Sequence, residues 1–256
     1  MSETAGSAAK RVAWVTGAGT GIGRELARRL AQQGWLVAAS ARTARDLDSL
    51  VAEAPERITA CLLDVTDEAA CAATAARIAE TLGPIDLAIL NAGSYFPTTA
   101  ENFSVANFRK TVDVNLMGEV NCMGPLAPAM IARRSGHIVL MASLTGYVGL
   151  PTAASYGATK AALISMAQAF KPDFERFGVT ISVINPGFVK TPATDKNDFP
   201  MPFLIGADEA VDHILKGIAD NRFEISFPWQ MSLLIRLLAS LPNWAKFEIT
   251  RRMLPR

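Results

Sequence analysis

Short apolar runs alternate with longer segments of helical period along most of this chain. The runs are rich in Val, Ile and Ala, a composition typical of strands that helices cover on both faces. Parallel strands need a crossover connection, and a helix is its usual form. The alternation therefore predicts an α/β protein with a mostly parallel, doubly wound sheet of seven strands, at 12–16, 35–40, 58–63, 87–91, 136–143, 180–185 and 223–227.

Helix signals occupy the segments between these strands. Helices are predicted at 22–33, 66–81, 105–134 and 155–177. Gly34 ends the first helix, and Thr66 is expected to cap the second. Pro172 has no amide hydrogen to donate, so we expect it to kink the last helix or to break it near Lys171.

Length and charge limit both the organisation and the function classes. The 256 residues are 50% hydrophobic and contain no Gly/Ser linker or internal repeat, which indicates one main domain. We expect that domain at 1–227, followed by an amphipathic helical extension at 228–256. The 25 Lys and Arg against 24 Asp and Glu give a net charge of +1, too balanced for the basic surface of a nucleic-acid binder.

Cysteine usage and the terminal segments bear on location. Three scattered cysteines suit neither a disulfide framework nor a C-x-x-C site, and the two histidines stand apart from any ligand cluster, so no metal is predicted. Met1 to Lys10 lacks the apolar core of a signal peptide. Met231 to Leu241 is too short to span a bilayer. We therefore expect a cytoplasmic protein with reduced thiols.

A glycine-rich turn follows the first predicted strand and reads T-G-A-G-T-G-I-G, from Thr16 to Gly23. Glycine is needed where the strand turns sharply and where backbone approaches a phosphate, and amide groups at the start of a helix attract anions. The turn predicts a dinucleotide phosphate site formed by Gly17, Thr20, Gly21, Ile22 and Gly23. The alternative is an ordinary strand-to-helix turn without a ligand.

The end of the second strand indicates which dinucleotide binds. An acidic residue there would favour NAD, whereas an arginine pairs with the extra phosphate of NADP. Ala41 occupies the position of the acid and Arg42 follows it. The prediction is NADP, with NAD as the second choice; the alternative for Arg42 is a solvated turn residue.

Tyr156 and Lys160 are four residues apart at the start of a predicted helix, so they share one helix face. A nearby cation favours the phenolate, and we expect Lys160 to lower the pKa of Tyr156 towards neutrality. Ser143 ends an apolar strand, and substrate sites lie at such carboxyl ends. The three residues predict a proton-transfer site.

Together these motifs resemble the classical short-chain dehydrogenase/reductase family, from about residue 10 to 227. The resemblance implies a single-domain Rossmann fold, with 1–227 as the catalytic domain, and an NAD(P)-dependent oxidoreductase that interconverts a carbonyl and a secondary alcohol. It implies that Tyr156 exchanges the proton, Lys160 also holds the nicotinamide ribose, and Ser143 polarises the substrate oxygen. Asn115 would interrupt a helix, and its backbone carbonyl would hold a relay water; the alternative is a buried structural amide.

The resemblance also implies further cofactor contacts. Asp64 and Val65 would contact the adenine, and the loop after the fourth strand would contribute Asn91, Ala92 and Gly93. The nicotinamide, next to Tyr156 and Lys160, would lie against a wall formed by Pro186, Gly187, Val189 and Thr191. We also expect a homo-oligomer, either a dimer or a tetramer. The rival function is a nucleotide-binding sensor or membrane-surface binding protein that keeps the fold but lacks turnover.

Two later segments bear on the substrate and the location. Residues 199–204, within a predicted lid at 192–206, are mostly apolar and favour an apolar carbonyl or alcohol substrate. In the extension, Ser232, Arg236 and Ser240 form a polar stripe beside a broad apolar surface. That surface suits an interfacial helix on anionic lipid, or a tail packed on its own domain or across a subunit interface.

Overall fold

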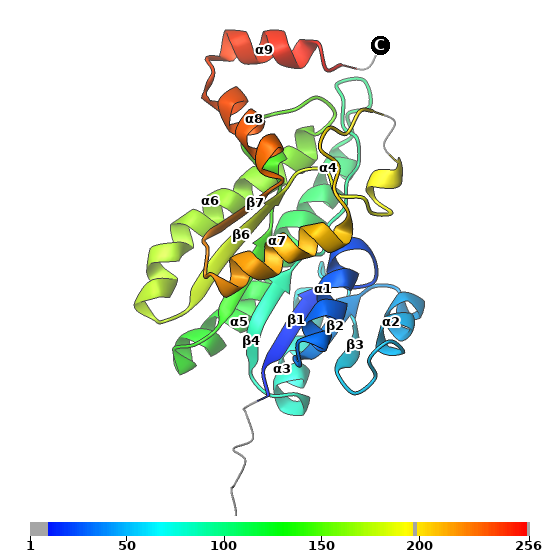
Figure 1. The fold of residues 1–256 in the computed structure, drawn as a ribbon, viewed down its shortest axis with the longest axis vertical. Coiled ribbons are helices and arrows are strands. Elements are labelled where there is room, and N and C mark those ends of the chain that lie inside the picture. Colours follow the sequence, from blue (N-terminus) through cyan, green and yellow to red (C-terminus); the bar gives the residue numbers. More distant parts are fainter. Residues whose placement is uncertain (1–9, 197–198, 255–256) are drawn as a thin grey trace, which may run out of the picture.

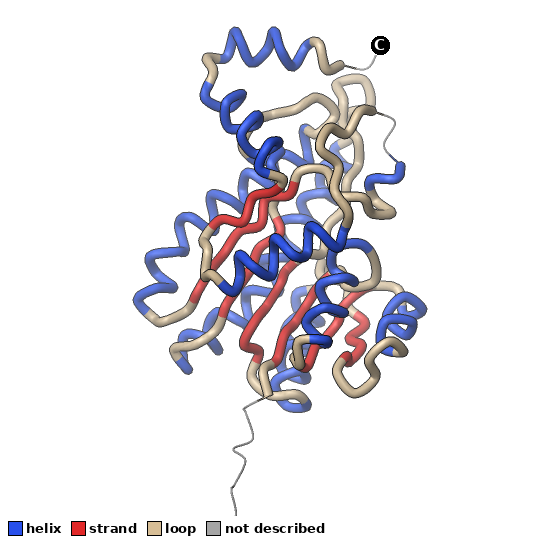
Figure 2. Tube along the Cα trace, viewed as in Figure 1, coloured by secondary structure: helices blue, strands red, loops and turns tan. Residues whose placement is uncertain are grey.

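A computed structural model describes residues 10–196 and 199–254. Within these residues the strands form one seven-stranded sheet in the order β3-β2-β1-β4-β5-β6-β7, and every neighbouring pair is parallel (Figure 2). The doubly wound α/β fold predicted from the sequence is confirmed. The strands are β1 Val12–Thr16, β2 Leu36–Ala41, β3 Ile58–Leu62, β4 Ile85–Leu90, β5 His137–Met141, β6 Thr180–Pro186 and β7 Glu224–Phe227.

Helices cover both faces of the sheet (Figure 1). On one face, α3 (Glu68–Thr81), α5 (Gly118–Arg133) and α6 (Ala154–Arg176) bury their apolar residues against the strands. On the other face, α1 (Gly21–Gln32), α2 (Ala44–Val51) and α7 (Ala207–Ala219) do the same. The central strand β1 is fully buried between the two layers, as the apolar run predicts.

Two local expectations are wrong. Asp67, not Thr66, caps α3, because the Asp67 carboxylate accepts the amide of Ala70 at 2.9 Å. Thr66 instead donates its hydroxyl to Asp64 at 2.8 Å. The helix α6 continues past Pro172, so the alternative of a break near Lys171 is wrong, and Phe174 beyond the proline is buried in the core.

The segment predicted as one helix at 105–134 is divided. Helix α4 (Val105–Val112) leads into a single π-helical turn, η1 (Asp113–Met117), and α5 follows directly. Such a turn inserts an extra residue and redirects the side chains after it. Asn115 lies in the middle of η1, where the family resemblance implies the interruption.

The extension forms two helices, α8 (Trp229–Ser240) and α9 (Asn243–Arg251), drawn above the sheet in Figure 1. Arg236, in the polar stripe of α8, pairs with Glu224 of β7, whereas Leu233 and Leu237 are about half exposed. Ser232, Ile235 and Leu238 are buried, so α8 packs onto the domain beside β7, whereas no described residue of α9 is buried. Residues 1–9 of the predicted domain and residues 255–256 of the predicted extension lie outside the described residues.

The remaining irregular elements are two short 3-10 turns, η2 (Leu144–Gly146) after β5 and η3 (Thr194–Lys196) after β6. Among the described residues, none of the helices combines the length and the hydropathy needed to cross a membrane. The three cysteines are buried and form no disulfide in the described part of the chain. The Cys122 thiol donates a hydrogen bond to the sulfur of Cys71 at 3.7 Å.

Candidate active site

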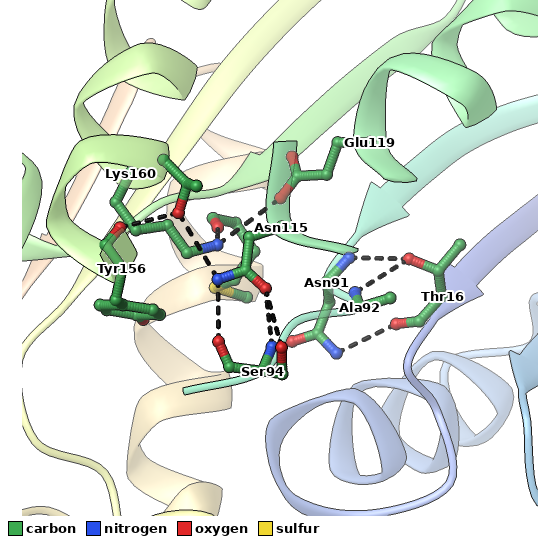
Figure 3. Close-up of polar contacts among 10 residues, drawn as sticks. Thr16, Asn91, Ala92, Ser94, Asn115, Glu119, Tyr156 and Lys160 are labelled. Carbon is green, nitrogen blue, oxygen red and sulfur yellow. Dashed lines mark hydrogen bonds and ion pairs between the residues drawn. The ribbon is translucent and has the colours of Figure 1, made fainter. Parts of the chain in front are cut away.

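The sheet order reverses between β1 and β4, and the loops that leave these strands border one crevice. Asn91, directly after β4, joins the two loops (Figure 3). Its side-chain amide donates to the carbonyl of Thr16 at 3.0 Å, and its backbone amide donates to the Thr16 hydroxyl at 2.9 Å. The amide of Ala92 donates to the same hydroxyl at 3.1 Å. Thr16 and Asn91 therefore hold the glycine-rich turn against β4.

The glycine-rich turn leaves no room for side chains at two positions. Gly17 has a φ of +66°, and a Cβ there would lie 2.8 Å from the Asn91 amide nitrogen. A Cβ on Gly23 would lie 2.3 Å from the carbonyl oxygen of Gly17. Thr20 immediately precedes α1, and Gly21 and Ile22 form its first turn, whose amide groups have no partners within the helix. The cradle therefore fits a phosphate group at the start of α1.

The far end of the crevice is a cleft of about 700 Å³. Arg42, Asp64 and Val114 line it, together with the basic residues Arg109 and Lys110 of α4. The Arg42 guanidinium is 63% exposed and lies 4.0 Å from the Asp64 carboxylate. The backbone amide of Thr66 lowers the pKa of Asp64, with a smaller contribution from Arg42. Glu68 and Asp113 also line the cleft, so its three basic side chains are balanced by three acidic ones. The exposed guanidinium of Arg42 is the group that suits an anionic ligand.

Ser143, Tyr156 and Lys160 lie together, as the sequence predicts. Ser143 follows β5, and its hydroxyl accepts the amide of Thr145 at 3.2 Å and donates to the carbonyl of Pro186 at 3.4 Å. Tyr156 and Lys160 stand one turn apart on α6, with the Lys160 ammonium 5.6 Å from the centre of the Tyr156 ring. That ammonium is buried and donates to the carbonyl of Met141 at the end of β5 (Figure 3).

The acidity of Tyr156 differs from the prediction. Burial raises the pKa of Tyr156 to about 12, although the neighbouring Ser143 acts in the opposite direction. The negative charge of Glu119 raises it further. A lowered pKa of Tyr156 is therefore not seen in this structure, because burial is the largest influence and Glu119 acts in the same direction. Burial also lowers the pKa of Lys160 itself.

Asn115 fixes the loop after β4 to the π-helical turn. Its amide nitrogen donates to the carbonyl of Ser94 at 2.8 Å, and its amide oxygen accepts the backbone amide of Ser94 at 2.7 Å (Figure 3). It also donates to the hydroxyl of Thr159 on α6 at 3.5 Å. Gly93 lies beside this amide, and a Cβ there would be in ordinary van der Waals contact with its oxygen, at 3.5 Å. The side chain therefore positions both the loop and the catalytic helix.

The remaining predicted residues border the same crevice. Pro186 ends β6, and Gly187 packs closely against Pro228 at the start of the extension. Val189 forms a β-bridge with Ile205. Thr191 reaches the glycine-rich turn, where a Cβ on Gly21 would lie 3.1 Å from its methyl group. Val65 contacts α5 at Gly118, so the loop after β3 is also packed against α5.

Sequence analysis missed Glu119. Its carboxylate is buried and lies 3.8 Å from the Lys160 ammonium. The available signal was an acidic residue four places after Asn115, in an otherwise apolar helix.

The protein-family comparison assigns the class. The model of the short chain dehydrogenase family matches residues 11–200, which include the glycine-rich turn and all the predicted catalytic residues. The chain therefore belongs to the short-chain dehydrogenase family.

Individual relatives agree with this assignment. An uncharacterized oxidoreductase of Myxococcus xanthus is 37% identical over 236 residues, 91% of this chain and 93% of the relative. A 3-oxoacyl-(acyl-carrier-protein) reductase of Thermotoga maritima is 31% identical, covering 73% of this chain and 77% of the relative. The crystal structure of an actinorhodin polyketide ketoreductase variant with NADPH has a TM-score of 0.77 and 26% identity, covering 85% and 94% of the two chains.

Proposed function

We propose that the protein is an NADPH-preferring oxidoreductase that interconverts a carbonyl and a secondary alcohol, with Tyr156 as the general acid and base. The observation that carries this proposal is the meeting of Ser143, Tyr156 and Lys160 beside a glycine cradle. Two relatives support the carbonyl, since one is named as a 3-oxoacyl reductase and the other as a ketoreductase. The intact cluster favours this function over a sensor without turnover.

The residues of the crevice fit a nicotinamide dinucleotide. Gly17, Gly21 and Gly23 leave space for the pyrophosphate at the start of α1. Asp64 and Val65 would hold the adenine, and Arg42 the ribose phosphate of NADP. Asn91 to Gly93 and Pro186 to Thr191 would enclose the nicotinamide, with Lys160 on its ribose. When bound, the nicotinamide supplies the hydride.

The protein's own groups manage one proton and one developing charge. In reduction, the phenol of Tyr156 donates its proton to the substrate oxygen, and the Ser143 hydroxyl stabilises the charge that forms there. In oxidation, Tyr156 accepts the proton. Lys160 favours the phenolate through its positive charge. The side chain of Asn115 holds α6 and the loop after β4 together, and its backbone carbonyl is available to a relay water.

The substrate class follows from the segment after Thr191. Phe199, Phe203 and Leu204 are each between 36% and 44% exposed, and the rings of Phe188 and Phe199 lie 6.0 Å apart. These side chains provide an apolar cover, which suits an apolar carbonyl compound. Residues 197–198 of the predicted lid lie outside the described residues.

Substitution of Tyr156 tests the catalytic assignment. Tyr156→Phe removes only the hydroxyl, so we expect kcat for NADPH-dependent reduction of an apolar ketone, 2-decanone, to fall by about 10² to 10⁴-fold. The affinity for NADPH, followed by tryptophan fluorescence, stays unchanged. Tyr95→Phe is the matched control, because the Tyr95 hydroxyl contacts only Thr152 among the described residues. Equal activity of the two variants would remove Tyr156 from the mechanism.

The extension leads to a proposal about location. We propose a cytoplasmic homo-oligomer that contacts an anionic membrane surface through α8 and α9. Their exposed apolar surface is accompanied by Lys246, Arg251 and Arg252, of which both arginines pair with Glu248. A basic apolar segment suits acidic lipid. We call the exposed apolar surface the α8–α9 surface; it comprises Trp229, Leu233, Leu234, Leu237, Trp244 and Phe247.

A further inference from the structure

A carboxylate is buried directly behind the catalytic lysine. Glu119 lies in the first turn of α5, one turn after Asn115, and its side chain is 1% exposed. One carboxylate oxygen lies 3.8 Å from the Lys160 ammonium, and the Lys160 side chain is 3% exposed. Among the described residues, neither oxygen of Glu119 has a hydrogen-bond partner within ordinary geometry. A buried acid is costly unless a partner compensates it, and this one faces the ammonium.

The groups around Glu119 come from several elements. Helix α6 contributes Lys160 and Tyr156, and β5 contributes the Met141 carbonyl, which accepts from the same ammonium. On α5 itself lies Cys122, whose thiol meets that of Cys71 from α3. The loop after β4 brings Tyr95 against the Tyr156 ring, with centroids 5.4 Å apart. Lys160 is thus the cation that faces Glu119 among the described residues.

The position of Glu119 is set by the fold. The π-helical turn η1 precedes it, and Gly118 packs so closely that a Cβ there would lie 2.6 Å from Val65. These contacts fix the first turn of α5 against the sheet, so the carboxylate cannot swing away to solvent. The ammonium is held from the other side by the Met141 carbonyl, at the strand end next to Ser143.

We infer that Glu119 is a positioning residue, the counter-ion that holds the Lys160 ammonium and sets the pH range in which Tyr156 transfers its proton. This inference rests on the proposed function for its catalytic consequence. The ion pair itself is a property of the folded chain and can be tested without turnover.

The sign of the effect follows from the charges. Burial raises the pKa of Glu119 well above its ordinary value, and the Lys160 cation opposes that rise. An ionised Glu119 disfavours the phenolate of Tyr156 and favours the ammonium of Lys160. Removing the negative charge therefore lowers the pKa of both groups and moves the pH profile of the reaction to lower pH.

The first test reads the charge of Glu119 directly. Glutamate labelled with ¹³C at the carboxyl carbon is incorporated into the full-length protein, and the NMR signal missing from Glu119→Gln identifies Glu119. We expect the signal of an ionised carboxylate at pH 7. In Lys160→Met the same signal should shift to the protonated form, because the buried acid has lost its cation. An unchanged titration in Lys160→Met would overturn the inference.

The second test reads the catalytic consequence. For oxidation of 2-decanol with NADP, we expect the rise of kcat/KM with pH to move to lower pH by at least about 0.5 unit in Glu119→Gln. Glu175→Gln is the matched control, since Glu175 is an exposed residue of α6 that pairs with Lys171. Thermal unfolding and NADPH binding establish that each variant is folded.

The outcomes separate the two proposals. A wild-type protein that binds no dinucleotide and turns over no carbonyl would refute the proposed function, while the NMR titration would still decide whether Glu119 and Lys160 are coupled. An active Glu119→Gln variant with an unshifted pH profile would refute the role of Glu119 in proton transfer.

Discussion

Asp64 would compete with a phosphate for Arg42 at the end of the crevice where we propose that the adenosine binds. The guanidinium is 4.0 Å from the carboxylate, but 63% of its side chain is exposed and available to a ligand. Because the existing pair is solvated and weak, a ribose phosphate can displace it at little cost. A doubly charged phosphate also forms stronger bonds with arginine than an exposed carboxylate does.

This arrangement predicts the effect of removing the guanidinium. Arg42→Ser should weaken NADPH binding by about 1.5–3 kcal/mol, roughly 10-fold or more, and leave NADH binding unchanged. Quenching of tryptophan fluorescence measures both affinities. Trp14 is a suitable reporter, since it is buried in β1 and donates to Ser40 at the end of β2. Equal losses for the two dinucleotides would show that Arg42 does not read the phosphate.

The predictability of the site differs from residue to residue. Tyr156 and Lys160 could be paired because both lie on one helix, and Ser143 could be joined to them because it ends a buried strand. Glu119 could not be paired with Lys160, since their distance depends on how α5 packs beside α6. The raised pKa of Tyr156 could not be predicted either, because it depends on burial of the phenol, which the sequence alone does not reveal.

At the scale of elements, strands were predicted more reliably than helix ends. Every predicted strand is present to within a few residues, because the apolar runs are short and well separated. The division of 105–134 into α4, η1 and α5 has no periodic signal, since the extra residue of a π turn changes the phase only locally. The side of α8 that faces the sheet could not be predicted either, because it depends on the ion pair between Arg236 and Glu224 of β7.

One carboxylate anchors α8 to the sheet. Glu224 accepts hydrogen bonds from Ser226, Tyr147 and Arg236, and the Arg236 guanidinium lies 5.0 Å from the centre of the Tyr147 ring. Asn185 completes the cluster by donating to the Tyr147 hydroxyl at 2.8 Å. Burial acts to raise the pKa of Glu224, but these hydrogen bonds outweigh it and lower the pKa.

The anchor predicts a pH-dependent stability. A lowered pKa stabilises the fold above the unfolded-state pKa, and the contribution is lost as the pH falls through the folded-state pKa. Glu224→Gln should therefore cost about 1 kcal/mol in the free energy of unfolding at pH 7 and almost nothing at about pH 2, where the carboxyl is protonated in both states. Urea unfolding at both pH values measures this. Glu248→Gln, on the exposed helix α9, should have little effect at either pH.

At the scale of the whole molecule, the α8–α9 surface places several exposed apolar side chains on two consecutive helices. Trp229 is 69% exposed and Trp244 is 77% exposed. Exposed apolar patches of this kind usually mark a surface that binds a partner or a membrane. We expect the protein to float with liposomes that contain phosphatidylserine and to remain at the bottom with neutral phosphatidylcholine. High salt should weaken the binding, because part of it is electrostatic.

Matched variants make this prediction specific. Leu233→Asp and Leu237→Asp place charge in the α8–α9 surface and should abolish flotation without loss of fold. Phe103→Asp places the same charge at another exposed apolar position and should leave flotation intact. If the wild-type protein ignores anionic liposomes and light scattering shows a dimer that Leu237→Asp dissociates, the surface joins two copies instead.

The strand order has a consequence for how the protein is made. After β1, the strands β2 and β3 extend the sheet on one side. Strand β4 then joins the free edge of β1, and β5, β6 and β7 each join the strand before them. On that side the chain can assemble in the order of its synthesis, as domains do on the ribosome. Asn91, which bonds to Thr16 beside the glycine-rich turn, is then in place before Tyr156, Lys160 and Thr191 have been translated. A nascent chain that stalls before α6 carries the glycine-rich turn and an open sheet edge, but neither Tyr156 nor Lys160.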